Sequence, residues 1–466
     1  MDIGIRDTEG NQKLHFYGGL AGAIVPFILF ISGVIAIALS GAPDERGFWP
    51  VLLIALAAGL LLAKDRRAYS ETVMDGMSEK VVMIMITAWI LASTIGKLMQ
   101  VSGFVDAMVW TCTELNLQAT GFIAASFIIC CLVSLSTGSS FATILICGPL
   151  LYPAGGALGA HLPTLAGAII GGATVGDFIA PVSDTTIVSA LSQKAEIGPT
   201  VKSRVRYILP AALLALVAFI LSSLLSPEAT NRPEVFTEVS SKGLPMLLVP
   251  VLIIFLFLKG KHLFHGLLTG LMFGIVLGLA LGLIPMNQLI EIDLENFTAK
   301  SFIVDGINRA IGISIFTILL MGLVATLKAS GLINKLVAFA AGRSKTPTHA
   351  EGWISGAMSA AVLLTTHSAV AILMVSEFAN RTGEKMGVGP TRRANILSLV
   401  ACTFPFLLPY FIPVILMTNM SRSGQEFDIP AVTPLEVGLY NFVSWALLLV
   451  TIAVVIFGFG RKKQKA

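Results

Sequence analysis

The chain has 466 residues, of which 55% are hydrophobic and only 12% are charged, with a formal net charge of +4. Its mean hydropathy is +0.85. This composition excludes an ordinary water-soluble protein and predicts an all-α polytopic membrane protein, because the bilayer interior requires long apolar helices. No GxxxxGK[ST] phosphate loop occurs, so we do not expect ATP-driven transport on this chain. The five cysteines lie in apolar runs without metal-ligand spacing, which is typical of small core residues.

Two apolar runs, residues 17–40 and 48–63, follow a polar N-terminal segment. The first run is too long for the core of a signal peptide, so we interpret it as a retained span. Lys64, Arg66 and Arg67 follow the second run. Because Lys and Arg are enriched in cytoplasmic loops, this loop and the N-terminus are predicted to lie inside. Residues 80–99 would then cross outward, and residues 104–115 would lie at the outer surface.

The next segments predict a re-entrant hairpin and a broken span. Residues 119–134 and 141–151 flank a polar break, and neither half has the ~20 residues that a span needs. We therefore predict a hairpin at 119–157. Its tip is formed by Thr137, Gly138, Ser139 and Ser140. The broken span, residues 162–200, is rich in glycine around its first acid. It carries Asp177, breaks at Pro181 and continues with Ser183, Asp184, Thr185 and Thr186.

The second half of the chain repeats this plan after spans at 207–225, 243–258 and 263–284. A run from Asp305-Gly306 to Ser330-Gly331 matches the run from Asp75-Gly76 to Ser102-Gly103. A second hairpin, 350–380, is broken at Thr365-Thr366-His367-Ser368. A second broken span, 392–420, contains three prolines, and a last span, 435–459, leads into a basic tail. The count is about ten transmembrane helices plus two re-entrant hairpins, with both termini cytoplasmic.

These elements divide the chain into four parts. We predict N-terminal scaffold spans in 1–74, inverted repeat 1 in 75–226, linking scaffold spans in 227–304 and inverted repeat 2 in 305–460. Each repeat holds three spans and a hairpin, and an odd number of spans forces the second copy to insert upside down. Inverted repeats with broken helices that meet at mid-membrane are typical of secondary transporters.

The first broken span carries the residues best suited to bind a cation. A charged side chain at the bilayer centre costs about 2.5–3.5 kcal/mol on insertion scales, so an acid there needs a partner, a cavity or an ion. Proline also frees a helix carbonyl. We predict a site for Na⁺ or a proton, formed by Asp177, Ser183, Asp184, Thr185 and Thr186. The alternative is that Asp184 only caps a half-helix, since Ser-Asp-Thr-Thr after a proline is a good N-cap sequence.

The two hairpin tips are candidate solute-binding segments. The hydroxyls and amides of Thr137, Gly138, Ser139 and Ser140 would face the acid site, or else form an ordinary glycine bend with satisfied hydroxyls. In the second half, Thr366, His367, Ser368 and Asn395 offer polar groups to a neutral or anionic solute. His367 is a candidate proton carrier because its free pKa lies near neutrality, but a hydrogen-bonded structural role is the simpler interpretation.

Two motifs carry a family resemblance. The run GGATVGDFIAPVSDTT resembles a signature of the NhaC-type Na⁺/H⁺ antiporter family, within the ion transporter superfamily, and LSTGSSFATILICGP resembles its hairpin segment. The resemblance covers residues 75–420. It implies Na⁺ as the coupling ion, no organic cofactor, a homodimer in a bacterial inner membrane, and a moving part that holds both hairpins. It places the ion site at Asp177 and residues 183–186, with Thr137, Ser139 and Ser140 opposite.

One departure from the family pattern keeps the solute open. The antiporters carry an acidic L–E–D–x–G–T segment in the second broken span, where this chain has Leu399-Val400-Ala401-Cys402-Thr403-Phe404-Pro405. Some relatives move small organic acids or amino acids with the cation. The leading hypothesis is a Na⁺/H⁺ antiporter that works by elevator-like alternating access. The alternative is Na⁺- or H⁺-coupled transport of a small organic acid or amino acid.

Two other classes rank below these. A channel would need a continuous polar pore and no occluding hairpins. A membrane enzyme is disfavoured because no catalytic dyad follows from the sequence spacing.

Overall fold

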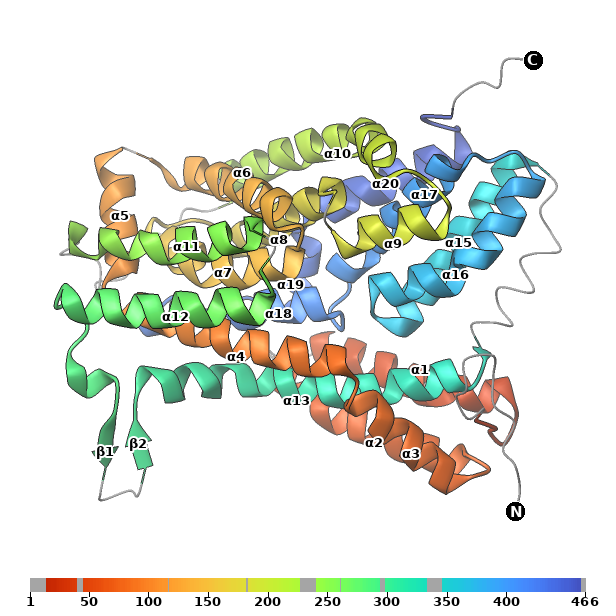
Figure 1. Cartoon of the computed structure of the whole chain (residues 1–466), viewed down its shortest axis with the longest axis horizontal. Helices are drawn as coiled ribbons and strands as arrows, with labels where there is room; N and C mark the ends of the chain where they lie inside the picture. Colours follow the sequence, from red (N-terminus) through yellow and green to blue (C-terminus); the bar gives the residue numbers. More distant parts are fainter. Residues whose placement is uncertain are drawn as a thin grey trace.

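The computed structural model describes residues 14–39, 45–115, 117–181, 183–226, 240–259, 261–293, 298–332 and 346–461. It is built almost entirely of helices that run roughly along one direction (Figure 1). Within these residues, seven helical segments are long and apolar enough to cross a membrane, and four shorter apolar helices accompany them. The predicted all-α polytopic fold is confirmed, whereas the count of ten full spans stays a prediction.

The N-terminal region contains one helix that the sequence did not predict. Helices α1 (Leu20–Leu39), α2 (Phe48–Leu62, after the 3₁₀ turn η1, Glu45–Gly47) and α4 (Lys80–Val101) match the first three predicted spans. The residues expected to form a loop after α2 instead form α3 (Arg66–Met77). Asp65 caps it by accepting hydrogen bonds from the Arg67 and Ala68 amides at 2.9 and 3.0 Å. Helix α5 (Phe104–Glu114) follows, and Phe104, Val105 and Val109 on it are buried within the protein, while its place at the outer membrane surface stays a prediction.

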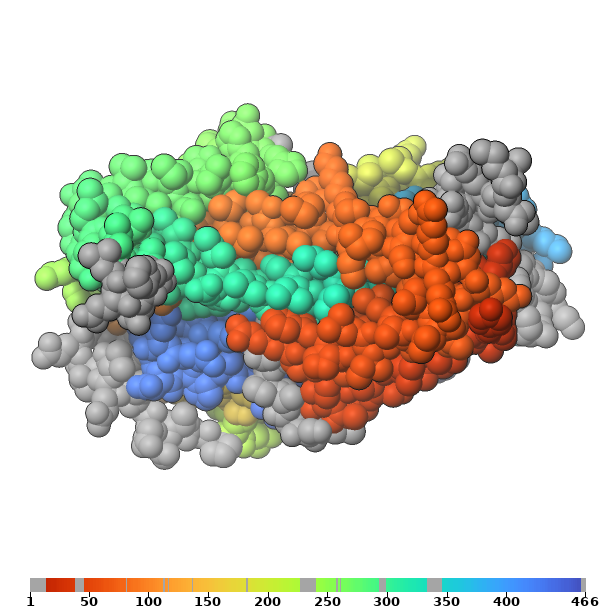
Figure 2. Space-filling view, turned by 90° about the horizontal axis from the view of Figure 1, so that it is seen from below, coloured from red at the N-terminus to blue at the C-terminus, as the bar shows by residue number. Residues whose placement is uncertain are grey.

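Helix α13 (Phe302–Ala329) packs along α3 and α4 through the glycines of the repeated motif. A Cβ on Gly306 would lie 2.4 Å from the Thr94 Cα, and a Cβ on Gly76 would lie 3.3 Å from the Gly322 Cα. Thr94 and Gly322 are matched positions, because each lies nine residues before the glycine that ends its motif. The two motifs therefore contact each other reciprocally, as two units related by a pseudo-twofold axis would. Figure 2 shows α13 as a strip between the N-terminal helices.

Ion pairs follow the same reciprocal pattern. Lys97, near the end of α4, lies 3.5 Å from Asp305 at the start of α13. Lys328, near the end of α13, lies 3.6 Å from Glu79 just before α4. A cation near one helix C-terminus thus meets an acid near the N-terminus of the other, which both helix dipoles favour.

Each predicted hairpin is a pair of helices with a two-residue tip. The first consists of α6 (Ala119–Thr137) and α7 (Ser140–Ala157), the second of α15 (Pro347–Thr365) and α16 (Ser368–Lys385). At the tips, Gly138 (φ 66°, ψ 23°) and Thr366 (φ 54°, ψ 10°) are both left-handed. The next residues, Ser139 and His367, are both extended. Two unrelated tip sequences thus adopt one backbone conformation.

Both predicted breaks in the broken spans are observed. The first span is α8 (Leu162–Ile179) followed by α9 (Asp184–Ser192). The second is α17 (Pro390–Ala401), the 3₁₀ turn η5 (Phe404–Phe406) and α18 (Ile412–Ser421). The second half of each broken span packs against the hairpin of the other repeat, α9 on α16 and α18 on α7 (Figure 1). Each hairpin therefore contacts elements of both halves of the chain.

The remaining elements complete the bundle. Helix α10 (Ile197–Leu225) lies beside α20 (Phe442–Ile456), and α11 (Leu248–Leu258, after η3, Ser241–Leu247) lies beside α12 (Leu263–Ala280). After η4 (Met286–Gln288), strands β1 (Glu291–Asp293) and β2 (Thr298–Lys300) form an antiparallel pair that was not predicted. The 3₁₀ turn η6 (Arg422–Phe427) follows α18. The predicted last span is instead two helices, α19 (Pro434–Leu439) and α20, because the Asn441 side chain caps α20 anew.

Several charges behind the predicted orientation lie outside the described residues. They include the N-terminal Arg6 and Lys13, the acids of the 226–242 loop, and Lys462, Lys463 and Lys465 of the tail. The placement of both termini on the cytoplasmic side therefore stays a prediction.

Candidate functional site

The first hairpin tip and the first broken span meet at a buried carboxylate. The Ser140 hydroxyl, in the first turn of α7, donates a hydrogen bond of 2.7 Å to Oδ2 of Asp177, near the end of α8. Asp177 is only 6% exposed, and its Oδ1 has no hydrogen-bond partner among the described residues. A buried carboxylate oxygen without a partner pays a desolvation cost, so it is the position where a cation or a proton would be most stabilising.

The break after this acid brings two further hydroxyls into the interior. Helix α8 ends at Ile179, the chain turns through Pro181, and the buried Ser183 precedes α9. The Ser183 and Thr185 hydroxyls are hydrogen-bonded at 2.9 Å. The Asp184 Oδ1 accepts from the Thr185 amide at 2.7 Å, at the N-terminus of α9. Among the described residues, Ser183 stands at the N-cap of α9 without a side-chain capping bond, and Asp184, the first residue of the helix, bonds only this one amide.

The two predicted acids lie in different surroundings. Asp177 is buried, whereas the Asp184 residue is exposed. The two carboxylates are nevertheless close enough to interact electrostatically, and Asp184 also acts on His367 at the second hairpin tip. Of the two acids in the predicted site, only Asp177 is therefore buried.

The other residues of the first tip satisfy local bonds. The Ser139 hydroxyl caps α7 by accepting from the Ala142 amide at 3.2 Å. The Thr137 hydroxyl reaches the Ser134 and Ser139 carbonyls only at 3.5 and 3.4 Å. Gly138 supplies the left-handed turn. Of the four predicted tip residues, Ser140 alone hydrogen-bonds the acid.

The second tip makes the matching contact with a different acceptor. The Ser368 hydroxyl donates to the Ala401 carbonyl at 2.9 Å, where α17 ends. The Thr366 hydroxyl donates to the Thr365 carbonyl at 2.7 Å. His367 is half-buried, and its Nδ1 has no hydrogen-bond partner among the described residues. The second tip therefore contacts a carbonyl where the first contacts a carboxylate.

A buried arginine that was not predicted as a site residue lies beside these breaks. Arg204, on α10, has an exposed fraction of 0%. It donates to five neutral acceptors: Asn395 Oδ1 (3.2 Å), the Phe178 carbonyl (2.8 Å), Thr186 Oγ1 (2.6 Å), Ser189 Oγ (2.8 Å) and Ser398 Oγ (2.7 Å). An oxygen that accepts from a guanidinium is a poor ligand for a second cation. Thr186 and Asn395 are therefore the predicted site residues whose surroundings fit ligand binding least.

A signal for the burial of Arg204 was present in the sequence. Thr200, Arg204, Ile208, Ala211 and Ala215 recur at helical spacing, and all lie on the buried face of α10. The neighbouring Lys202 and Arg206 point outward.

The described residues contain no group of three or more His, Cys, Asp or Glu side chains that could hold a metal ion. The donors around Asp177 are instead one carboxylate and several hydroxyls. Na⁺ in transporters is coordinated by such oxygen sets, together with carbonyls freed at helix breaks. The residues present fit a transported alkali cation better than a resident transition metal.

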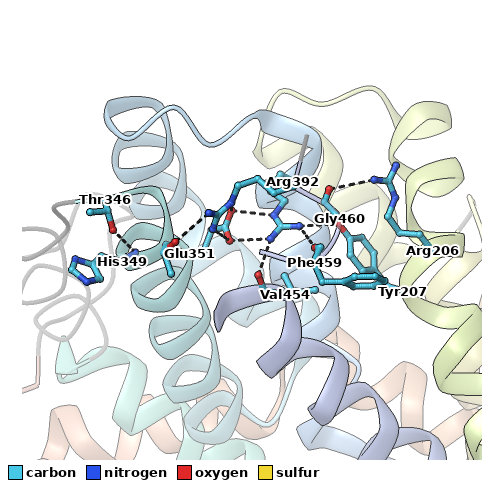
Figure 3. A network of polar contacts seen from close by, with 11 residues as sticks. Arg206, Tyr207, Thr346, His349, Glu351, Arg392, Val454, Phe459 and Gly460 are labelled. Atoms are coloured by element: carbon cyan, nitrogen blue, oxygen red, sulfur yellow. Dashed lines mark hydrogen bonds and ion pairs between the residues drawn. The ribbon is translucent and has the colours of Figure 1, made fainter. Parts of the chain in front are cut away.

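A second buried ionic group lies at the base of the second hairpin (Figure 3). Glu351, on α15, is 1% exposed in its side chain and accepts from Arg392 at 2.9–3.0 Å and from Arg461 at 2.7–3.2 Å. Arg392 also donates to Tyr207 and to the Val454 and Phe459 carbonyls. This Arg–Glu–Arg triad joins α15, α17, α10 and the segment after α20 into one fixed unit.

The part of the chain that carries this geometry is similar to a known protein family. Residues 19–224, which include the first hairpin, Asp177 and Arg204, match the profile of the Na⁺/H⁺ antiporter family. This part of the chain, somewhat under half of its length, is similar to the Na⁺/H⁺ antiporter family. The resemblance to NhaC-type antiporters that the two motifs predicted is therefore confirmed.

Two bacterial proteins have sequences similar to parts of this chain. It is 28% identical over 264 residues to the Na⁺/H⁺ antiporter NhaC of Bacillus subtilis (strain 168), covering 54% of this chain and 56% of the relative. It is 26% identical over 179 residues to the malate-2H⁺/Na⁺-lactate antiporter of the same organism, covering 38% of this chain and 37% of the relative. The chain thus matches between about a third and somewhat over half of the length of these two relatives.

Among solved structures, the Alcanivorax borkumensis YdaH transporter aligns over 94% of this chain and 99% of its own, with 12% identity and a TM-score of 0.41. A score of that size is too low to establish a shared fold.

Proposed function

We propose that this membrane protein is a Na⁺-coupled secondary transporter that exchanges Na⁺ for H⁺ by alternating access. The observation that carries the proposal is the buried Asp177, bonded through one oxygen to the hairpin tip and open at the other. The similarity of residues 19–224 to the Na⁺/H⁺ antiporter family supports the same proposal.

In this mechanism Asp177 holds either Na⁺ or a proton, never both. The ionised carboxylate accepts from Ser140 and offers Oδ1 to Na⁺, and the buried hydroxyls of Ser183 and Thr185 supply further oxygens. Protonation removes the negative charge that binds the cation, so a proton arriving from one side releases Na⁺ there. Exchange follows if the site opens to one side of the membrane at a time.

The proposed moving unit consists of the two hairpins, the two broken spans, and α10 and α20, which Arg204 and the Arg–Glu–Arg triad bond to them. Each hairpin packs on half-helices of both broken spans, which would let these elements travel together. The remaining spans would form the scaffold and the dimer interface. We keep the division into inverted repeats at 75–226 and 305–460, and cytoplasmic termini, as parts of this proposal.

A second candidate is coupled transport of a small organic acid. The second tip favours it, because the Ser368 hydroxyl there donates to a carbonyl and not to a carboxylate that could bind a cation. In addition, the His367 Nδ1 has no hydrogen-bond partner among the described residues. The N-terminus of α16 at this tip would attract a carboxylate. One relative is named for malate and lactate, which is consistent with this candidate.

Reconstitution in liposomes with an internal pH dye tests the proposal. We expect Na⁺ alone to dissipate an imposed pH gradient in wild type, and Asp177→Asn to abolish this response. The control is Glu71→Gln, which removes an exposed acid of α3. A gradient that collapses only when an organic acid is added would favour the second candidate. An unchanged Na⁺ response in Asp177→Asn would refute the role of this acid.

A further inference from the structure

Arg204 is a buried cation that makes no hydrogen bond to an acid among the described residues. All five of its N–H groups donate to neutral oxygens, and its guanidinium lies 5.1 Å from the centre of the Phe178 ring. Burial of an ion costs several kcal/mol even after relaxation, and neutral hydrogen bonds leave its net charge uncompensated. The negative charge that compensates Arg204 must therefore come from an acid that is not hydrogen-bonded to it.

The acceptors of Arg204 belong to three different helical segments. Phe178 follows Asp177 in the last turn of α8, Thr186 and Ser189 lie on α9, and Asn395 and Ser398 lie on α17. The Ser398 hydroxyl also donates to Ser189 at 2.8 Å. One side chain of α10 thus holds both halves of the first broken span and the first half of the second.

The acid that balances Arg204 is the one in the candidate site. Arg204 donates at 2.8 Å to the carbonyl of Phe178, the residue directly after Asp177, and the Asp177 carboxylate interacts electrostatically with the guanidinium. The two are not hydrogen-bonded to each other, because Asp177 Oδ2 bonds to Ser140 and the Arg204 donors are all used. Asp177 therefore feels a positive charge while its Oδ1 stays open to a ligand.

We propose that Arg204 is a positioning residue that acts as a fixed counter-charge to Asp177, balancing the carboxylate when no cation is bound. The inference rests on the proposed function. The guanidinium stabilises the empty, ionised site and repels an incoming Na⁺, so it weakens cation binding enough to permit release. The same five hydrogen bonds hold the breaks of the two spans in a fixed position relative to each other while Na⁺ binds and leaves.

Variants of Arg204 that remove its charge or keep it distinguish this electrostatic role from a purely structural one. At an effective dielectric of 20, a unit charge within about 12 Å changes cation affinity by roughly tenfold or more. In Arg204→Gln we expect the half-saturating Na⁺ concentration to fall about tenfold, with slower turnover because release is hindered. In Arg204→Lys we expect near wild-type half-saturation, even if the melting temperature falls. Lys202→Gln, an exposed charge two residues earlier on α10, is the matched control and should change neither.

The measurements are Na⁺-driven exchange in liposomes and Na⁺-dependent thermal stabilisation in detergent. If Arg204→Gln does not fold, Ser189→Asp decides, because it pairs the guanidinium in place and should also lower the half-saturating Na⁺ concentration. Unchanged or raised half-saturation in a folded Arg204→Gln or Ser189→Asp variant would overturn the inference. A wild-type protein without any Na⁺ response would instead refute the proposed function. The wild-type assay alone tests this, without the variants.

Discussion

The two hairpin tips share a backbone but differ in chemistry. In both, a left-handed residue is followed by an extended one, and the next serine donates to the end of the first half-helix of its own broken span. Ser140 finds the Asp177 carboxylate, whereas Ser368 finds the Ala401 carbonyl. The two tips therefore have the same backbone geometry, but only the first contacts an acid. This fits a transporter with one cation site at the first tip and a different role for the second.

The bases of the two hairpins also differ in chemistry, because only the second contains charged groups. At the base of the first, Thr120 on α6 and Ser223 on α10 share a neutral hydrogen bond of 2.8 Å. At the base of the second, Glu351 on α15 meets Arg461 just beyond α20, and Arg392 completes the triad. The corresponding helices are joined in both places, but only the second joint is a buried ionic group.

The largest effect is expected at this ionic joint. Glu351→Gln leaves two arginines without their shared acid, and breaking a buried ion pair in this way costs about 3–5 kcal/mol. Thr120→Val, which removes the neutral joint of the first hairpin, should cost about 1 kcal/mol. Unfolding of both variants in detergent, followed by circular dichroism, measures the difference. Equal losses would show that the triad adds nothing beyond an ordinary hydrogen bond.

The next effect concerns cation affinity at the tips. Ser140→Ala removes the hydrogen bond to the Asp177 carboxylate, and a bond to a charged group is worth about 1.5–3 kcal/mol. We expect Na⁺ half-saturation to shift about tenfold or more in this variant. Ser368→Ala, its counterpart, should leave Na⁺ half-saturation unchanged. A Na⁺ shift in Ser368→Ala as large as that in Ser140→Ala would mean that both tips serve one cation site.

Sequence reasoning located the tips and breaks well because glycine, proline and hydroxyl residues mark them locally. Thr137–Ser140 and Thr365–Ser368 are where the hairpin helices turn, and Pro181 is where the first span breaks. It failed where the outcome depends on tertiary packing. The exposure of Asp184 follows from which helix lies opposite it, which spacing along one chain does not reveal, whereas the helical spacing of Thr200, Arg204 and Ile208 does indicate a buried face.

The smallest effect comes from exchanging the turn residues of the two tips. Gly138→Thr places a β-branched residue at φ 66°, where a left-handed conformation costs about 1–2 kcal/mol, so we expect a loss of that size. Thr366→Gly relieves the same strain at φ 54° but adds unfolded-state entropy of about 0.4–1 kcal/mol and loses the Thr366 hydroxyl bond, so it should be nearly neutral. Unfolding free energies of the two variants test this asymmetry. If Thr366→Gly destabilised as much as Gly138→Thr, the Thr366 side chain would have a role beyond the turn, which would strengthen the case for a solute at the second tip.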